Sequence, residues 1–155
     1  MRRSEYEIST VAGIVNVIAQ CNVMRICMND GEYPFCVPMN FGYEVAEDKL
    51  TFFFHGAKAG RKIKLLKANP KVSFEMDCAH QLVTGDKACA YSYKYTSVMG
   101  IGAVTFLEGN TEKAIAINRI MQHVTGMSGF QFTDAELENV EVFKLVSTSY
   151  SGKKR

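Results

Sequence analysis

The chain has 155 residues, 47% of them hydrophobic and 22% charged, which is the composition of a soluble globular protein. Its 18 Lys and Arg against 16 Asp and Glu give a net charge of +2, too small to indicate a nucleic-acid-binding protein by itself. We find neither a signal-peptide pattern nor an apolar run long enough to cross a bilayer. We therefore expect one domain, residues 1–155, in the cytoplasm.

The cysteine pattern gives no sign of a metal centre. The five cysteines are odd in number and show no C-x-x-C spacing, so neither a zinc motif nor a redox motif is present. Most lie in apolar runs, where a thiol acts as a small hydrophobic group. We expect reduced cysteines and no metal site.

In the N-terminal part, apolar residues at helical spacing predict an amphipathic helix over residues 11–20. A strand is predicted over 23–28, and Asn29-Asp30-Gly31 is a strong hairpin turn signal. A second strand is predicted over 35–43. Pro38 inside it indicates an edge, a bulge or a gap in pairing, which would leave backbone groups free to meet a ligand.

The next segment predicts a central strand over 50–55, because it is apolar on both faces. A basic helix follows and is closed by Asn69-Pro70. A fourth strand is predicted over 72–76, and residues 80–87 read as a loop around Gly85-Asp86.

The C-terminal part begins with a long β-like tract over residues 88–108, in which Gly100 and Gly102 indicate a bend. An amphipathic helix is predicted from Thr111, with Gly126 as its C-cap. A last strand is predicted over 140–150. Strands outnumber helices and no βαβ alternation is present, so the fold class is α+β, with a small closed β-barrel and helices packed outside.

Residues 52–70 form the most informative stretch of the chain. An apolar strand runs into a small-residue turn and then the basic helix. No Asp or Glu occurs from Lys49 to Phe74, while seven of the 18 Lys and Arg do. Small residues let a phosphate approach the backbone, the helix N-terminus points N–H groups at it, and Arg61 and Lys62 would neutralise it. The pattern predicts a site for a phosphorylated cofactor, although a solvated helix face is the alternative.

Four motifs carry a resemblance to a known superfamily: V-P-M-N-F-G-Y at 37–43, H-G-A-K-A-G-R-K at 55–62, N-P-K-V at 69–72 and Y-T-S-V-M-G-I-G at 95–102. The chain resembles the FMN-binding split β-barrel superfamily. Within it, the chain looks most like the nitroimidazole-resistance (Nim) proteins, relatives of pyridoxamine 5′-phosphate oxidase. The fold implied is a mostly antiparallel, Greek-key split barrel with helices outside.

The resemblance implies a homodimer that binds two FMN molecules in clefts between its subunits. It assigns the isoalloxazine ring to backbone groups of Val37, Pro38, Met39, Asn40 and Phe41, and the ribityl chain to the turn of His55, Gly56 and Ala57. Arg61 and Lys62 would bind the phosphate. Further contacts would come from Ser97, Val98 and Met99 of the partner subunit.

His55 is the candidate catalytic residue, because it follows an apolar strand beside the phosphate-like turn and matches a histidine typical of the Nim family. His80 and His123 are expected to be structural. The tyrosines at 91, 93 and 95 are read as one face of a half-buried strand or a dimer interface; a stacking platform for bases is the alternative.

The leading hypothesis is an FMN-dependent oxidoreductase, nitroreductase-like, with a small-molecule electron donor and acceptor and with neither nucleic acid nor a membrane as partner. Three alternatives stay open. The protein could be a non-catalytic flavin or haem binder, in which His55 would ligate iron, or a pyridoxamine phosphate oxidase-like enzyme. RNA binding by the basic helix and the tyrosine strand is the third.

Overall fold

The computed structural model describes residues 4–47 and 49–155. Its strands are β1 (Glu7–Ile8), β2 (Met24–Asp30), β3 (Tyr33–Met39), β4 (Gly42–Ala46), β5 (Lys49–Gly56), β6 (Lys71–Val83), β7 (Ser92–Phe106) and β8 (Glu141–Lys154). Its helices are α1 (Val11–Gln20), α2 (Arg61–Ala68), α3 (Asn110–Thr125) and α4 (Asp134–Glu138), with 3₁₀ turns η1 (Ser4–Tyr6) and η2 (Ala88–Ala90). This α+β content was predicted.

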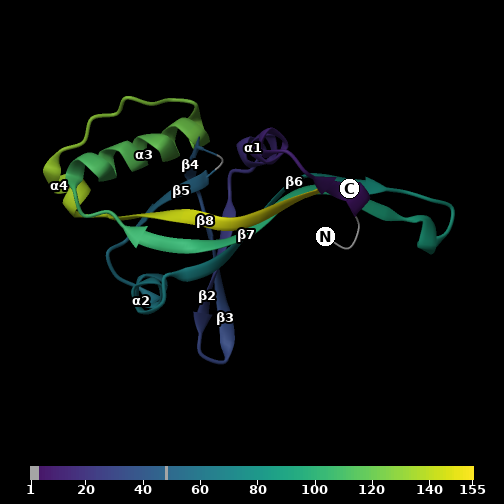
Figure 1. Ribbon diagram of the computed structural model, residues 1–155, viewed down its shortest axis with the longest axis horizontal. Helices are drawn as coiled ribbons and strands as arrows, with labels where there is room; N and C mark the ends of the chain where they lie inside the picture. Colours follow the sequence, from purple (N-terminus) through teal and green to yellow (C-terminus); the bar gives the residue numbers. More distant parts are fainter. Residues whose placement is uncertain (1–3, 48) are drawn as a thin grey trace.

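The strands form one antiparallel sheet in the order β3-β2-β6-β7-β8-β5-β4, and β1 pairs with the end of β8. The sheet curls, with α3 and α4 on one side near β4 and β5 and α2 on the other (Figure 1). The two end strands, β3 and β4, follow one another in the chain, yet no ladder joins them in the described part of the molecule. The barrel is therefore split, as the resemblance implied, and the expectation of a closed barrel from the number of strands was wrong.

Most of the predicted elements are confirmed. Thr10 caps α1 and accepts a hydrogen bond from the Gly13 amide, and Gly126 ends α3 in the left-handed conformation at φ 76°. The predicted strand over 35–43 is two strands, and β3 is an edge strand, one of the three arrangements that Pro38 indicated.

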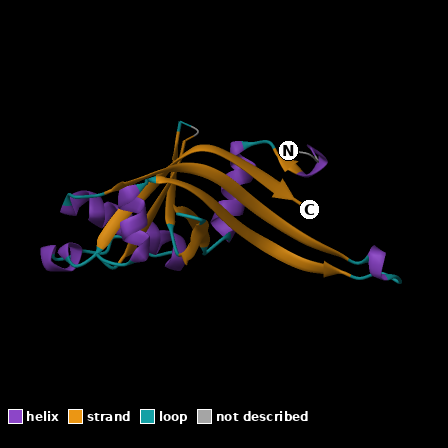
Figure 2. Ribbon diagram, turned by 90° about the horizontal axis from the view of Figure 1, so that it is seen from below, coloured by secondary structure: helices purple, strands orange, loops and turns teal. Residues whose placement is uncertain are grey.

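Two local assignments were wrong. Residues 80–83 continue β6 and do not form a loop, because β6 and β7 pair as far as Val83 and Ser92. These two strands extend as a long hairpin beyond the rest of the molecule, with η2 at its tip (Figure 2). Helix α4 was not predicted, although Thr133 and Glu136 form a capping box at its start.

The predicted bend in β7 is a change of register between Ile101 and Gly102. A Cβ at Gly102 would lie 2.3 Å from the carbonyl oxygen of Val146, so the close approach of β8 requires glycine there. The bend lets β7 and β8 curve together around the core.

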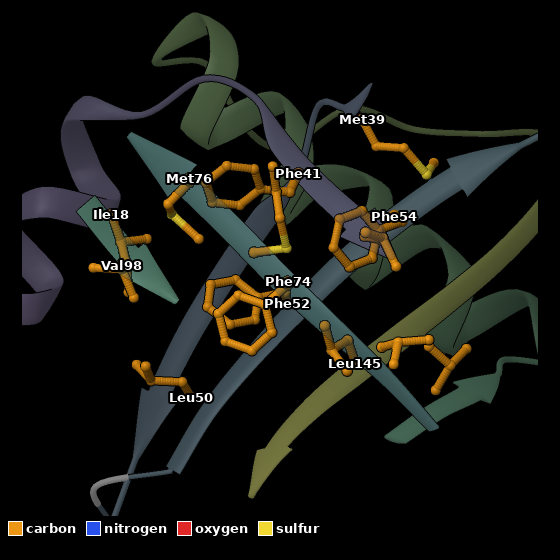
Figure 3. Packing of buried hydrophobic residues seen from close by; sticks show 14 of the residues in the cluster. Ile18, Met39, Phe41, Leu50, Phe52, Phe54, Phe74, Met76, Val98 and Leu145 are labelled. Carbon is orange, nitrogen blue, oxygen red and sulfur yellow. The ribbon is translucent and has the colours of Figure 1, made fainter. Parts of the chain in front are cut away.

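Aromatic rings fill the main core. Phe41, Phe52, Phe54, Phe74 and Phe143 have no more than 2% of their surface exposed. Phe52 packs against Phe41 and Phe74, with ring centroids 5.8 and 5.2 Å apart, and Met39 lies at the margin of the cluster (Figure 3). A second cluster under α3 contains Phe53, so β5 is buried on both faces, as its sequence predicted.

Cys27 and Cys36 form a disulfide across the β2–β3 hairpin. This corrects the expectation that all five cysteines are reduced. The register of the hairpin places the two residues directly opposite one another, which spacing along the chain did not reveal. In the described residues, no helix has the length and apolar character needed to span a membrane.

Candidate functional site

The candidate site lies where β5 ends and α2 begins. Gly60 is the N-cap of α2, with φ 134° and no side-chain cap, a conformation that favours glycine. The first backbone hydrogen bond of the helix runs from the Lys64 amide to the Gly60 carbonyl. The amides of residues 61–63 precede that bond, so they have no partner within the helix and are available to an anion.

Lys62 is the best-placed cation of the site. Its side chain is half-buried, and its Nζ contacts the Sδ of Met39 at 3.3 Å. Burial lowers the pKa of this ammonium, and no carboxylate of the described residues offsets the effect. A Cβ at Gly56 would lie 3.1 Å from Nζ, so the ammonium occupies the space that a side chain would fill there. A desolvated cation beside an uncapped helix start fits an anionic ligand.

His55 lies at the end of β5, next to Lys62 in space. Desolvation lowers its pKa below the usual value of 6.5, and the positive charge of Lys62 lowers it further. The imidazole is therefore mainly neutral at pH 7. A negative charge bound at Lys62 would offset the second effect and favour the imidazolium form.

Arg61 was expected to have no acidic neighbour, and this was wrong. Its guanidinium forms an ion pair with Asp30 and lies 4.5 Å from the centroid of the Phe35 ring. No acid is near in the sequence, but the β2–β3 hairpin brings Asp30 to the start of α2. The Arg61 side chain is 64% exposed, and such a surface pair contributes about 0–1 kcal/mol, so it could be exchanged for a phosphate.

Residues 37–39 end the edge strand β3, and residues 40 and 41 follow it. Met39 contacts Lys62, Val37 is half-buried against the core, and Pro38 is exposed. The Asn40 side chain donates to the Asn22 carbonyl at 2.8 Å. Phe41 is fully buried, so only its backbone could meet a ligand.

The structure does not bring the segment of Ser97, Val98 and Met99 to this corner. His55 lies opposite Val142 on β8, whereas Met99 lies opposite Ser151, nine residues further along. The separation is roughly 30 Å measured along the strand. Val98 is fully buried in the core, while Met99 is 56% exposed on the outer face of the sheet.

A depression of about 500 Å³ lies on that outer face. It is lined by Glu75, Asp77, Tyr95, Ser97, Met99, Ser151 and Lys153. The Lys153 ammonium donates to the Tyr95 hydroxyl at 2.7 Å. Sequence reasoning singled out Ser97 and Met99 but gave no role to Lys153, because only the β7–β8 pairing places it beside Ser97.

The other two histidines have the structural contacts that were expected. His123 forms a 2.8 Å hydrogen bond with the Cys21 carbonyl and packs 4.6 Å from the ring of Phe41. His80 pairs with Asp77 at 2.5 Å. Neither one lies at the β5–α2 corner.

The sheet order, with β3 and β4 at its two ends, defines the molecule as a split β-barrel protein. The chain belongs to the pyridoxamine 5′-phosphate oxidase family, whose model matches residues 10–154. No curated protein matches the sequence.

Solved structures agree with this assignment. A candidate 5-nitroimidazole antibiotic resistance protein from Bacteroides thetaiotaomicron VPI-5482 is similar at 34% identity and a TM-score of 0.83, covering 96% of this chain and 86% of that one. The flavocytochrome Anf3 from Azotobacter vinelandii is similar at 20% identity and a TM-score of 0.75, covering 97% and 68%. An FAD- and haem-binding protein from Mycobacterium smegmatis is similar at 14% and 0.76, covering 96% and 73%. The last two likenesses concern the fold.

Proposed function

We propose that this protein binds FMN and acts as a flavin-dependent oxidoreductase in the cytoplasm. The observation that carries the proposal is the Lys62 ammonium, half-buried at the uncapped start of α2 with only a thioether contact in the described residues. A terminal phosphate matches this arrangement in charge and in hydrogen-bonding capacity.

The residues of the corner would divide the work of holding this cofactor. Lys62 and the first amides of α2 would bind the phosphate, and Arg61 would join them by leaving Asp30. Gly56 leaves room for the Lys62 ammonium, Ala57 would lie beside the ribityl chain, and the free edge of β3 at Val37 and Pro38 would border the ring. FMN would supply the electron chemistry, accepting two electrons from a small-molecule donor and passing them to a small-molecule acceptor.

A homodimer would complete the site. Met99 and Ile101 are 56% and 54% exposed on the outer face of β7, and Ser97 borders the depression beside them. Apolar side chains exposed together favour an interface with another chain. In our proposal, Ser97, Val98 and Met99 serve the FMN held by the partner subunit, Val98 through its backbone because its side chain is buried.

The acceptor that we propose is a nitroaromatic compound of the 5-nitroimidazole class. Support for it comes from the relative at 34% identity, which spans nearly the whole chain. His55 would place a proton donor beside the cofactor. The proposal does not involve nucleic acid or a membrane as partner.

Identification of the bound cofactor tests the proposal. We expect the purified protein to be yellow and to release FMN on heating, at up to one molecule per chain. Absorption spectra and mass spectrometry of the released compound are the measurements. A haem Soret band would instead support a haem binder. Release of FAD would contradict the assignment of a terminal phosphate to this site, because both phosphates of FAD are internal. Absence of binding when the apoprotein is titrated with FMN would refute the proposal.

Replacement of His55 with alanine should lower the turnover of a nitroimidazole by about 100-fold while FMN stays bound. If His55 donates a proton, wild-type turnover should fall as pH rises through its lowered pKa, below 6.5, and this pH dependence should vanish in the variant. Steady-state kinetics from pH 5 to 8 measure both effects. His80→Ala, which changes a histidine away from the corner, should leave turnover unchanged. Equal turnover of His55→Ala and wild type would remove His55 from the reaction.

A further inference from the structure

We propose that Cys27 and Cys36 form a thiol–disulfide exchange site on the β2–β3 hairpin, which takes a dithiol as its reductant. The two residues are nine positions apart in the chain and directly opposite in the ladder. Their chemistry is separate from the flavin reaction proposed above and does not depend on it.

The position of the pair makes one sulfur the point of attack. A thiolate approaches a disulfide on the far side of the sulfur that it attacks, so access to that side decides which sulfur reacts. Cys36 is exposed on β3, an end strand of the sheet, and the space beyond it is open. Cys27 is half-buried, and its neighbour on the other side is Ser73 of β6. The geometry therefore points to Cys36 as the attacked sulfur and Cys27 as the leaving group.

The surroundings of Cys27 suit a leaving thiolate. Its side chain borders a depression of about 510 Å³ on the outer face of the sheet, together with Ser73, Met99, Ile101 and Ser149. Ser73 lies beside this sulfur, and the departing thiolate takes up a proton that the reductant releases. Cys21 differs from this pair, because it is buried, and burial together with neighbouring Cys78 raises its pKa to about 12, which makes it a poor nucleophile.

The exchange takes place in two steps that conserve atoms and electrons. In the first, one thiolate of the reductant bonds to the Cys36 sulfur, the Cys27–Cys36 bond breaks, and Cys27 leaves as a thiolate that is protonated. In the second, the other thiolate of the reductant attacks the reductant sulfur that is bonded to Cys36, and Cys36 leaves as a thiolate that is protonated. The protein gains two electrons and two protons, and the reductant becomes a disulfide.

The exchange site lies in the segment that positions both cations of the candidate cofactor site. Asp30 and Phe35 of the same hairpin contact Arg61, and Met39 contacts Lys62. The cross-link thus joins the two strands that carry these contacts.

A trapping experiment tests the proposal on the full-length protein. The probe is thioredoxin whose second active-site cysteine has been replaced, so that the mixed disulfide cannot resolve. We expect a covalent adduct on Cys36, located by peptide mass mapping, and none on Cys27. With intact thioredoxin or with dithiothreitol, alkylation after denaturation should label five cysteines instead of three. Reaction with dithiothreitol alone would indicate a small dithiol as the reductant, and reaction with thioredoxin a protein dithiol.

Two variants make the outcome decisive. Cys89→Ser removes an exposed free thiol outside the hairpin, and it should leave the adduct on Cys36 unchanged. Cys36→Ser should abolish the adduct. The proposal is overturned if the adduct forms on Cys27 or Cys89, if neither dithiol reduces the pair in the folded protein, or if the untreated protein already yields five free thiols.

Discussion

Replacing Lys62 with methionine should weaken FMN binding by about 10- to 100-fold. A hydrogen bond from a charged group contributes about 1.5–3 kcal/mol, and a partly desolvated ammonium facing a phosphate lies in this range. Methionine keeps most of the length and the apolar stem of the side chain but removes its charge. Isothermal titration of the apoprotein with FMN measures the change in Kd.

The stability of the apoprotein separates this effect from a folding defect. Burial lowers the pKa of Lys62 in the folded state below its ordinary value of 10.5. The charged form therefore destabilises the fold, and the contribution of Lys62 to the free energy of unfolding becomes less favourable as pH falls below 10.5. Lys62→Met should therefore leave the Tm of the apoprotein unchanged or raise it slightly. Lys64→Met, an exposed lysine of the same helix, is the matched control and should change the FMN Kd by less than about threefold. Equal affinities of the two variants would contradict the phosphate site.

Replacing Gly42 with alanine should destabilise the fold by about 3 kcal/mol. An added Cβ would lie 2.4 Å from both the Arg119 carbonyl carbon and the Ile120 amide nitrogen, which are backbone atoms of α3. These atoms cannot move without shifting α3 away from β4 and opening the cluster around Phe53. At about 2–4 °C per kcal/mol for a domain of this size, Tm should fall by roughly 10 °C.

Gly56→Ala is the matched control, because it adds the same methyl group to a neighbouring strand. There the Cβ would meet the flexible end of Lys62 at 3.1 Å, and no backbone atom. We expect a stability change below about 1 kcal/mol, together with weaker FMN binding as the ammonium is displaced. Urea unfolding curves of both variants provide the comparison. If Gly42→Ala unfolds at the wild-type urea concentration, α3 does not pack on β4 as closely as described.

Local sequence signals located most of the elements, because each depends on residues close together in the chain. The hairpin turn at Gly31 and the C-cap at Gly126 each act within a few residues, and both were predicted. The extension of β6 to Val83 was missed. That segment is mostly exposed and shows no alternation of apolar and polar residues, and it becomes a strand by pairing with β7.

The candidate site was predicted in part. The run from His55 to Lys62 is one strand end, one turn and one helix start, so its chemistry is local and could be recognised. The Asp30–Arg61 ion pair and the Met39–Lys62 contact could not be recognised, since they join residues 31 and 23 positions apart. The separation of Ser97 from His55 likewise depends on the β7–β8 and β5–β8 registers.

Apolar periodicity and turn residues were enough to predict the α+β class from the sequence. The family was indicated by the resemblance of four motifs, and the lack of acids over residues 49–74 predicted a cationic corner after β5. The tertiary structure alone decided that Arg61 has an acidic partner and that Cys27 faces Cys36. Strand register and helix docking set these contacts, and both follow from burying the whole core at once.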